Sequence, residues 1–245
     1  MLNTLVKITA LTGLLLSSSY ADRSIKVKII NNTSASYFTP LLVTTHKHSH
    51  PLFRLGETAS SSLQAMAEGG DISGLSSDLL DMDAMIVENP ASGLLAPGKS
   101  TTATLKFNRH RKNSLSIVAM VLPTNDGFVA LNNWKIPKKS GTYVVPMNVY
   151  DAGTEANNEI INGAGAPGAL GIPADPGGHA GTGATGINTT AEGFVHVHRG
   201  TIGDLNATGG VSDLSQAYHG WLNPGATAII TVKYKKRRKH RRDDD

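Results

Sequence analysis

Short runs in which apolar and polar side chains alternate recur along the chain, and they constrain its fold more than any other feature. Alternation places one set of side chains on each face of an extended strand. Residues 24–30 and 101–107 follow this pattern, and residues 226–234 form a further run near the C-terminal end. Residues 114–122 are nearly all apolar, which indicates a strand at the centre of a sheet.

Two short segments early in the chain have helical rather than strand periodicity. Residues 59–68 predict a helix with Thr58 or Ser62 as its cap and Gly69-Gly70 as its end. Residues 75–83 predict a second helix, capped by Ser73 or Ser76. Further strands are expected at 41–45, 86–87, 128–131, 143–149 and 194–198. Seven or eight short strands with two small inserted helices predict an all-β protein, an antiparallel β-sandwich.

The N-terminal residues have the pattern of an export signal. Lys7 precedes a short apolar run at 8–16, and Ser19-Tyr20-Ala21 fits a small-x-small cleavage site. We expect a signal peptide over 1–21, cleavage after Ala21, and a secreted or periplasmic protein that is not transmembrane. The chain has no cysteine, which excludes disulfides, thiol catalysis and zinc-thiolate sites.

The remainder divides into one domain and a tail. We expect a β-sandwich domain over 22–234, within which residues 160–192 form a flexible loop rich in Gly and Pro. The tail, 235–245, is basic and ends in three Asp residues. From Lys233 onward there are eight Lys or Arg against three Asp, so the preceding chain has 15 basic and 16 acidic residues.

The positive charge is therefore a property of the tail and not of the folded domain. Proteins that read nucleic acids usually spread basic residues over a folded face, so no specific nucleic-acid partner is expected. The run KKRRKHRR at 235–242 suits an anionic polymer or a lipid head group. A solvated tail without a partner fits the same residues.

Two acidic loops follow predicted strands and supply the candidate metal ligands. Asn125-Asp126-Gly127 has the composition of a tight turn, and Asp151 and Glu155 flank a second bend that contains Gly153. Three carboxylates and nearby carbonyl groups suit calcium, which takes six to eight oxygen ligands in irregular geometry. Solvent-exposed turns have the same composition, and spacing alone does not separate the two interpretations.

Histidines offer an alternative metal chemistry. His196 and His198 share one face of a predicted strand, and joining them to Asp204 would suit zinc or iron, with or without catalysis. The alternating set His46, His48 and His50 is a further candidate. Surface or hydrogen-bonded histidines explain the same pattern. No Gly-x-Ser-x-Gly motif occurs, and acids that close a calcium loop are not free for acid/base chemistry, so we expect no enzymatic activity.

Several of these motifs, taken together, resemble those of the spondin N-terminal domain, the F-spondin and mindin type. More closely, the chain resembles bacterial exported proteins that carry this domain alone. The resemblance runs from about Lys26 to Tyr234 and rests on LLVTTH at 41–46, LFRLGE at 52–57, VLPTNDGFV at 121–129, YDAGTE at 150–155, GFVHVHRG at 193–200 and WLNP at 221–224.

This resemblance implies an eight-stranded, C2-like sandwich that holds calcium at one end and serves in adhesion to matrix or cell surfaces. By motif match, the calcium ligands would be Asp126, Asp151 and Glu155. Glu155 stands where the animal relatives usually have Asp, and the chain lacks their disulfides. The resulting hypothesis is an exported, non-enzymatic calcium-binding domain whose partner is an unidentified surface or matrix component.

Overall fold

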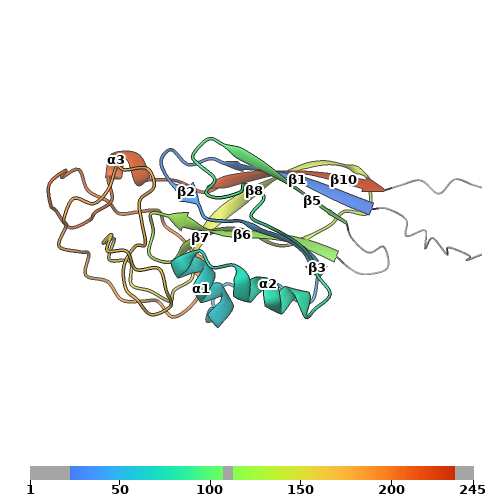
Figure 1. Ribbon diagram of the computed structural model, residues 1–245, viewed down its shortest axis with the longest axis horizontal. Helices are drawn as coiled ribbons and strands as arrows, with labels where there is room; N and C mark the ends of the chain where they lie inside the picture. Colours follow the sequence, from blue (N-terminus) through green and yellow to red (C-terminus); the bar gives the residue numbers. More distant parts are fainter. Residues whose placement is uncertain (1–22, 107–112, 235–245) are drawn as a thin grey trace, which may run out of the picture.

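The computed structural model describes residues 23–106 and 113–234, and it shows two stacked layers of antiparallel strands with helices against one side (Figure 1). The predicted signal peptide at 1–21 and the basic tail at 235–245 lie outside the described residues. No helix in the described part of the chain is long and apolar enough to cross a membrane.

Eight strands form the main path of the sheet in the order β4-β3-β6-β7-β8-β10-β1-β5, while β2 pairs with β6 and β9 pairs with β8. The strands are β1 Arg23–Asn31, β2 Tyr37–Phe38, β3 Leu42–Lys47, β4 Met85–Glu88, β5 Ser100–Lys106, β6 Asn113–Leu122, β7 Gly127–Lys135, β8 Gly141–Asp151, β9 His196–Val197 and β10 Ala226–Tyr234. The predicted all-β antiparallel sandwich with about eight strands is confirmed.

Strand β8 belongs to both layers and links them. Its first part, from Gly141 to Met147, pairs with β10, and its last part, from Asn148 to Asp151, pairs with β7. The layers also approach each other at the opposite edge, where the Thr45 hydroxyl of β3 donates to the Lys106 carbonyl of β5 at 3.4 Å. The sheet therefore folds back on itself and encloses a core.

The core between the layers follows from the alternation in the sequence. Ile25, Val27 and Ile29 of β1 are buried there, while Lys26 and Lys28 between them are exposed. Strand β6 is apolar on both faces because it lies between two cores. Its odd-numbered residues from 115 to 121 enter the inter-layer core, and Val118, Met120 and Leu122 enter a second core.

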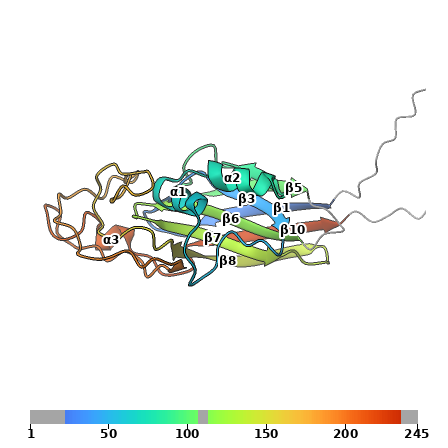
Figure 2. The same ribbon diagram turned by 90° about the horizontal axis from the view of Figure 1, so that it is seen from below.

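The second core is covered by helices α1 (Ser61–Gly69) and α2 (Ser73–Leu80), which lie on the near side of the sheet when the molecule is seen from below (Figure 2). Helix α1 contacts β6 and β7, and α2 contacts β4. Leu63 and Met66 of α1 are fully buried there beside Phe128 of β7. Burying one such side chain stabilises the fold by roughly 1.5–3 kcal/mol. Removal of the helices would therefore expose the outer face of β6.

The helix caps differ from those predicted. The Ser60 hydroxyl accepts the Leu63 N–H at 3.2 Å and caps α1, because Ser60 is the last residue with an extended backbone. Ser62 lies inside the helix, and Thr58 donates instead to the Gly193 carbonyl. Neither Ser73 nor Ser76 caps α2, whose cap position is Ile72.

The segment after β8 has few regular elements. It forms the end of the molecule opposite the first residue of β1 and the last residue of β10 (Figure 1). It contains the short helix α3 (Gln216–His219) and the two-residue strand β9, where the sequence predicted a five-residue strand at 194–198. Ile172 is fully buried within it and bridges to Ile161. The predicted flexibility of 160–192 stays a prediction.

Candidate metal centre

The two acidic loops meet at one end of the sandwich. Gly127, the first residue of β7, pairs with Asp151, the last residue of β8, so Asp126 and Asp151 lie at the same end of neighbouring strands. The Thr124 hydroxyl accepts the Gly127 N–H at 3.0 Å and donates to the Val121 carbonyl, which closes the turn between β6 and β7. This turn directs Asp126 into the protein, where it is 0% exposed.

Asp126 is a buried carboxylate in which only one of the two oxygens has hydrogen-bond partners. Its Oδ2 accepts the backbone N–H groups of Thr154 at 2.8 Å and Glu155 at 3.1 Å, whereas its Oδ1 has no hydrogen-bond partner. Burial raises the pKa of Asp126 to about 8, the charge of Asp151 adds to this rise, and the two N–H groups oppose it. The site therefore favours either a proton or a cation at this position.

Glu155 faces the loop that follows it. Its Oε1 accepts the Gly171 N–H at 2.9 Å, and its Oε2 is buried without a partner. Burial raises the pKa of Glu155 to about 7, and the charge of Glu68 adds to the rise. Of the other two predicted ligands, Asp151 raises the pKa of Asp126 more than Glu155 does. Their shared calcium site stays a prediction.

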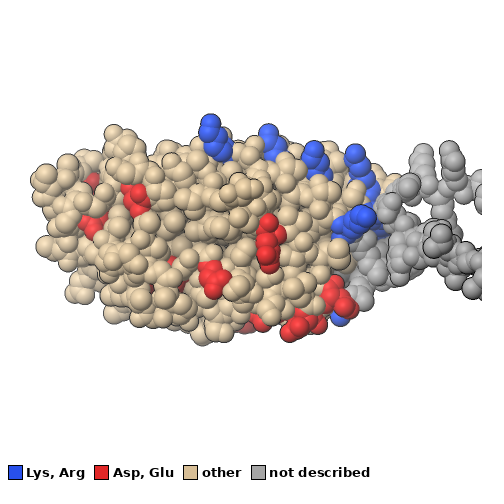
Figure 3. Space-filling model, in the orientation of Figure 1, with Lys and Arg blue, Asp and Glu red and all other residues tan. Residues whose placement is uncertain are grey.

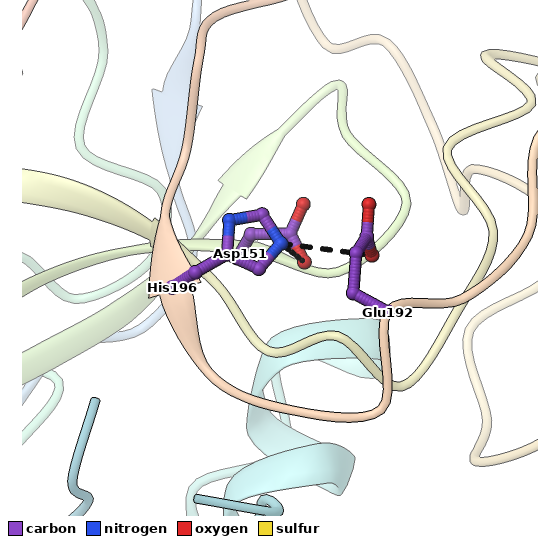
Figure 4. A group of neighbouring side chains, drawn as sticks. All are labelled: Asp151, Glu192 and His196. Atoms are coloured by element: carbon purple, nitrogen blue, oxygen red, sulfur yellow. Dashed lines mark ion pairs between the residues drawn. The ribbon is translucent and has the colours of Figure 1, made fainter. Parts of the chain in front are cut away.

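A tighter group forms around Asp151 (Figure 4). In the described part of the chain, Asp151, Glu192 and His196 are the three residues whose ligand atoms all lie within 4.8 Å of one another. His196 Nε2 lies 3.5 Å from Asp151 Oδ1 and 3.6 Å from Glu192 Oε2. His196 arrives there because β9 pairs with the end of β8, opposite Asp151.

Glu192 is the member of this group that the sequence patterns do not predict. Its position follows from contacts between distant parts of the chain: the Gly193 N–H donates to the Gly153 carbonyl at 2.8 Å, and the Val195 N–H donates to the Glu57 carbonyl at 2.9 Å. Residues around Glu192 have no periodic pattern that would assign them to a face. The only available signal was an acid four residues before His196.

His198 lies on the other side of Asp151 and is 8% exposed. Its Nε2 lies 4.0 Å from Asp151 Oδ2, and its ring lies 5.1 Å from the Trp221 ring. Its Nδ1 accepts the Gly200 N–H at 3.0 Å. Burial lowers the pKa of His198 to about 4, although the charge of Asp151 opposes this shift. The ring is therefore neutral at physiological pH.

The other predicted candidates have structural partners. Asp204 is not part of the group, because its carboxylate accepts N–H groups from Asn206, Val211 and Ser212 within its own turn. His46 Nε2 and His48 Nδ1 each lie 2.7 Å from a serine hydroxyl of β6. These contacts assign Asp204 and the two histidines to local structure.

A pocket of about 230 Å³ opens beside the metal-ligand group. Its polar lining includes Asp151, Asn157, Glu159, Glu192, His196 and His198. Glu159 already accepts the N–H groups of Ile202 and Gly203 and the Ser212 hydroxyl. The lining residues with buried, unpartnered side-chain atoms are Glu192, His196, His198 and Thr201, so the pocket lies directly beside the unsatisfied part of the site.

Comparison with known proteins identifies the domain. A model of the Spondin_N family matches residues 30–160, a range that contains Asp126, Asp151 and Glu155 but not Glu192, His196 or His198. No match was found among curated proteins. Spondin domains are extracellular. Because the match covers more than half of the chain, this protein belongs to the Spondin_N family.

Proposed function

We propose that this protein is an exported, non-enzymatic domain that binds calcium at the end of its sandwich and makes contact with a cell surface or matrix. The observation that carries the proposal is Asp126, a fully buried carboxylate with an unpartnered Oδ1 beside a second buried acid, Asp151. In the described part of the chain no Lys or Arg forms an ion pair with either acid. A bound cation would supply the missing positive charge.

Asp126, Asp151 and Glu155 would hold the ion. Calcium suits this set because it takes oxygen ligands in irregular geometry and tolerates a mixture of carboxylates, carbonyls and water. The unpartnered oxygens of Asp126 and Glu155 are available without the loss of an existing hydrogen bond. When bound, the ion would remove the repulsion between Asp126 and Asp151 and join the two loops.

A binding role fits this chemistry better than a catalytic one. The carboxylates that an acid/base mechanism would need are those that the cation would occupy. The segment after β9 also presents large hydrophobic side chains to solvent, and a contiguous patch of such side chains would suit a contact site. Those more than 40% exposed in this segment are Ile202, Leu205, Val211, Tyr218 and Leu222.

A calcium titration followed by thermal unfolding tests the proposal. Protein stripped with EDTA should gain stability as RT ln(1 + [Ca]/Kd), about 2.7 kcal/mol at 100 times Kd. This corresponds to a rise of roughly 5–10 °C in the unfolding midpoint for a domain of this size. Asp126→Asn should abolish the rise.

Asp204→Asn is the matched control, because Asp204 is another hydrogen-bonded loop acid at this end of the protein. It should leave the calcium-dependent rise unchanged. A wild-type unfolding midpoint that does not respond to calcium would contradict the proposed calcium site. Contact with a surface or matrix would then have to depend on other residues.

A further inference from the structure

We propose that Asp151, Glu192 and His196 form a second metal site, for a transition-metal ion of the zinc class, and that His198 positions Asp151 within it. This inference goes beyond the proposed calcium site. Two of the three ligands and His198 lie outside the range matched by the family model. The two sites have Asp151 in common and differ in their other ligands.

The distances fit ligands of one ion better than hydrogen bonds. Charged hydrogen bonds between nitrogen and oxygen measure about 2.7–2.9 Å, whereas His196 Nε2 lies 3.5 Å and 3.6 Å from the two carboxylate oxygens. Two ligand atoms of one tetrahedral zinc ion lie roughly 3.3–3.5 Å apart, because each bond is about 2.0–2.2 Å long. The side chains therefore already have nearly the spacing that the ion requires.

The unsatisfied atoms point to the same position. His196 Nε2, Glu192 Oε2 and His198 Nε2 are buried atoms without a hydrogen-bond partner. Buried polar atoms are almost always paired, so the orphan atoms of His196 and Glu192, both beside Asp151, indicate a missing ion. His198 Nε2 is also buried, and it lies 4.0 Å from the other oxygen of Asp151.

The hydrogen bonds of the two histidines give them different roles. His196 Nδ1 lies 3.1 Å from the Val197 carbonyl, so Nδ1 carries the proton and the Nε2 lone pair faces the carboxylates. Metal-binding histidines typically donate their other ring N–H to a carbonyl or carboxylate in this way. His198 Nδ1 instead accepts the Gly200 N–H, so its Nε2 carries the proton and faces Asp151 Oδ2. His198 is therefore a positioning residue.

The remaining contacts of Asp151 complete its orientation. Its Oδ1 accepts the Gly153 N–H at 2.8 Å, and its Oδ2 accepts the Asn157 side-chain N–H at 2.8 Å.

One neutral imidazole and two carboxylates balance the charge of a divalent ion. A nitrogen ligand favours zinc and its neighbours over calcium. Three protein ligands beside an open pocket leave a coordination position for water or a small solute.

Cobalt(II) absorbance and zinc calorimetry on the metal-free protein test this site. We expect one ion per chain, with the visible bands of a four- or five-coordinate cobalt ion. His196→Ala and Glu192→Gln should each weaken binding at least tenfold. His198→Ala should weaken it less than His196→Ala, because His198 acts through Asp151. The exposed residue His50 provides the control, and His50→Ala should bind as the wild type does.

The variants also separate the two sites. His196→Ala should keep the calcium-dependent rise in unfolding midpoint, Asp126→Asn should keep zinc binding, and Asp151→Asn should impair both. Wild-type zinc affinity in His196→Ala, or a loss of zinc binding in His50→Ala, would overturn the assignment. So would an absence of zinc or cobalt binding to the wild type. Thermal unfolding of each variant verifies that it is folded before the titration.

Discussion

At the scale of single residues, the site is governed by buried groups that lack a counter-charge. Asp126 keeps two backbone N–H contacts and still has a raised pKa, because two hydrogen bonds do not offset full burial and a neighbouring acid. Such a group destabilises the fold whenever it is ionised. A metal ion or a proton reverses that effect, so this position couples stability to both metal and pH.

The pH dependence of the metal-free protein follows from this pKa. The pKa of Asp126 is about 8 in the folded state against an ordinary value of 3.8. Between these values the native state binds more protons than the unfolded state, so stability falls as pH rises. For one such group, the free energy of unfolding falls by up to about 1.4 kcal/mol for each pH unit. In EDTA, the midpoint of Asp126→Asn relative to the wild type should rise by roughly 5–10 °C from pH 5.5 to pH 7.5.

Differential scanning calorimetry at the two pH values measures this difference. The comparison with Asp126→Asn cancels the contributions of histidines that are common to both proteins. A difference that stays constant with pH would mean that Asp126 is already ionised at pH 5.5, and the electrostatic account of this position would be wrong.

Gly153 shows how one residue holds the acidic loop in place. Its φ is +67°, and a Cβ at this position would lie 2.2 Å from the Phe194 carbonyl oxygen. Gly98 has the same φ but no atom within 4 Å of the corresponding Cβ. Gly98→Ala should therefore cost about 1–2 kcal/mol from backbone strain alone, and Gly153→Ala should cost about 2 kcal/mol more. Chemical denaturation of both variants measures the two costs, and equal values would exclude the predicted clash.

At the scale of elements, the strands were predictable and the site was only partly so. Alternation identified β1, β5 and β10, because each buries one face against the inter-layer core. The two-residue strand β2 and the four-residue helix α3 are too short to show a period. Asp126 and Asp151 were predictable as strand-end acids.

Glu192 was not predictable in the same way, because its place depends on contacts with residues near 57 and 153 in the sequence. Asp204 was a plausible partner for the histidines on composition alone. Its carboxylate instead accepts the N–H groups of Asn206, Val211 and Ser212. Sequence patterns thus assign residues to strands and turns, whereas the meeting of distant loops requires the fold.

The segment between β8 and β9 illustrates how acids can organise a loop that has little apolar bulk. Asp213 accepts the N–H of Ile161 with Oδ2 and the N–H groups of Gly183 and Ala184 with Oδ1, at 2.9–3.0 Å. Hydrogen bonds to a charged group are worth about 1.5–3 kcal/mol each. Asp213→Ala should therefore speed amide hydrogen exchange in residues 181–187 by roughly 10- to 100-fold.

Hydrogen exchange with peptide-level mass spectrometry measures this effect. Asp175→Ala is the matched control, because Asp175 organises another turn of the same segment through Gly177 and His179. It should leave exchange at 181–187 unchanged. Fast exchange of these residues already in the wild type would support the predicted flexibility of 160–192 and would show that Asp213 does not hold the segment.

At the scale of the whole molecule, the basic residues and the acidic candidate metal sites lie in different places. Lys and Arg lie mainly along one long edge of the face in Figure 3, whereas acids lie over the middle of this face, near its opposite edge and at the loop end. Register places the exposed residues Lys26 and Lys28 of β1, Lys106 of β5 and Lys233 of β10 on one face. The basic tail follows Lys233 in sequence, so the tail and this face would attract the same anionic partners.

This arrangement predicts binding to an anionic polymer such as heparin, and the binding should weaken stepwise as the tail and then the lysines of the β1 face are removed. Deletion of residues 235–245 should lower the salt concentration that elutes the protein from a heparin column, because the tail has seven Lys or Arg against three Asp and so accounts for the net positive charge of the chain. Lys26→Glu/Lys28→Glu should lower it further, whereas Lys138→Glu/Lys139→Glu, an equal charge change in the turn between β7 and β8, should have the smaller effect. Elution at an unchanged salt concentration after the deletion would exclude the tail as the binding element. Equal effects of the two double variants would mean that net charge, and not the β1 face, determines retention.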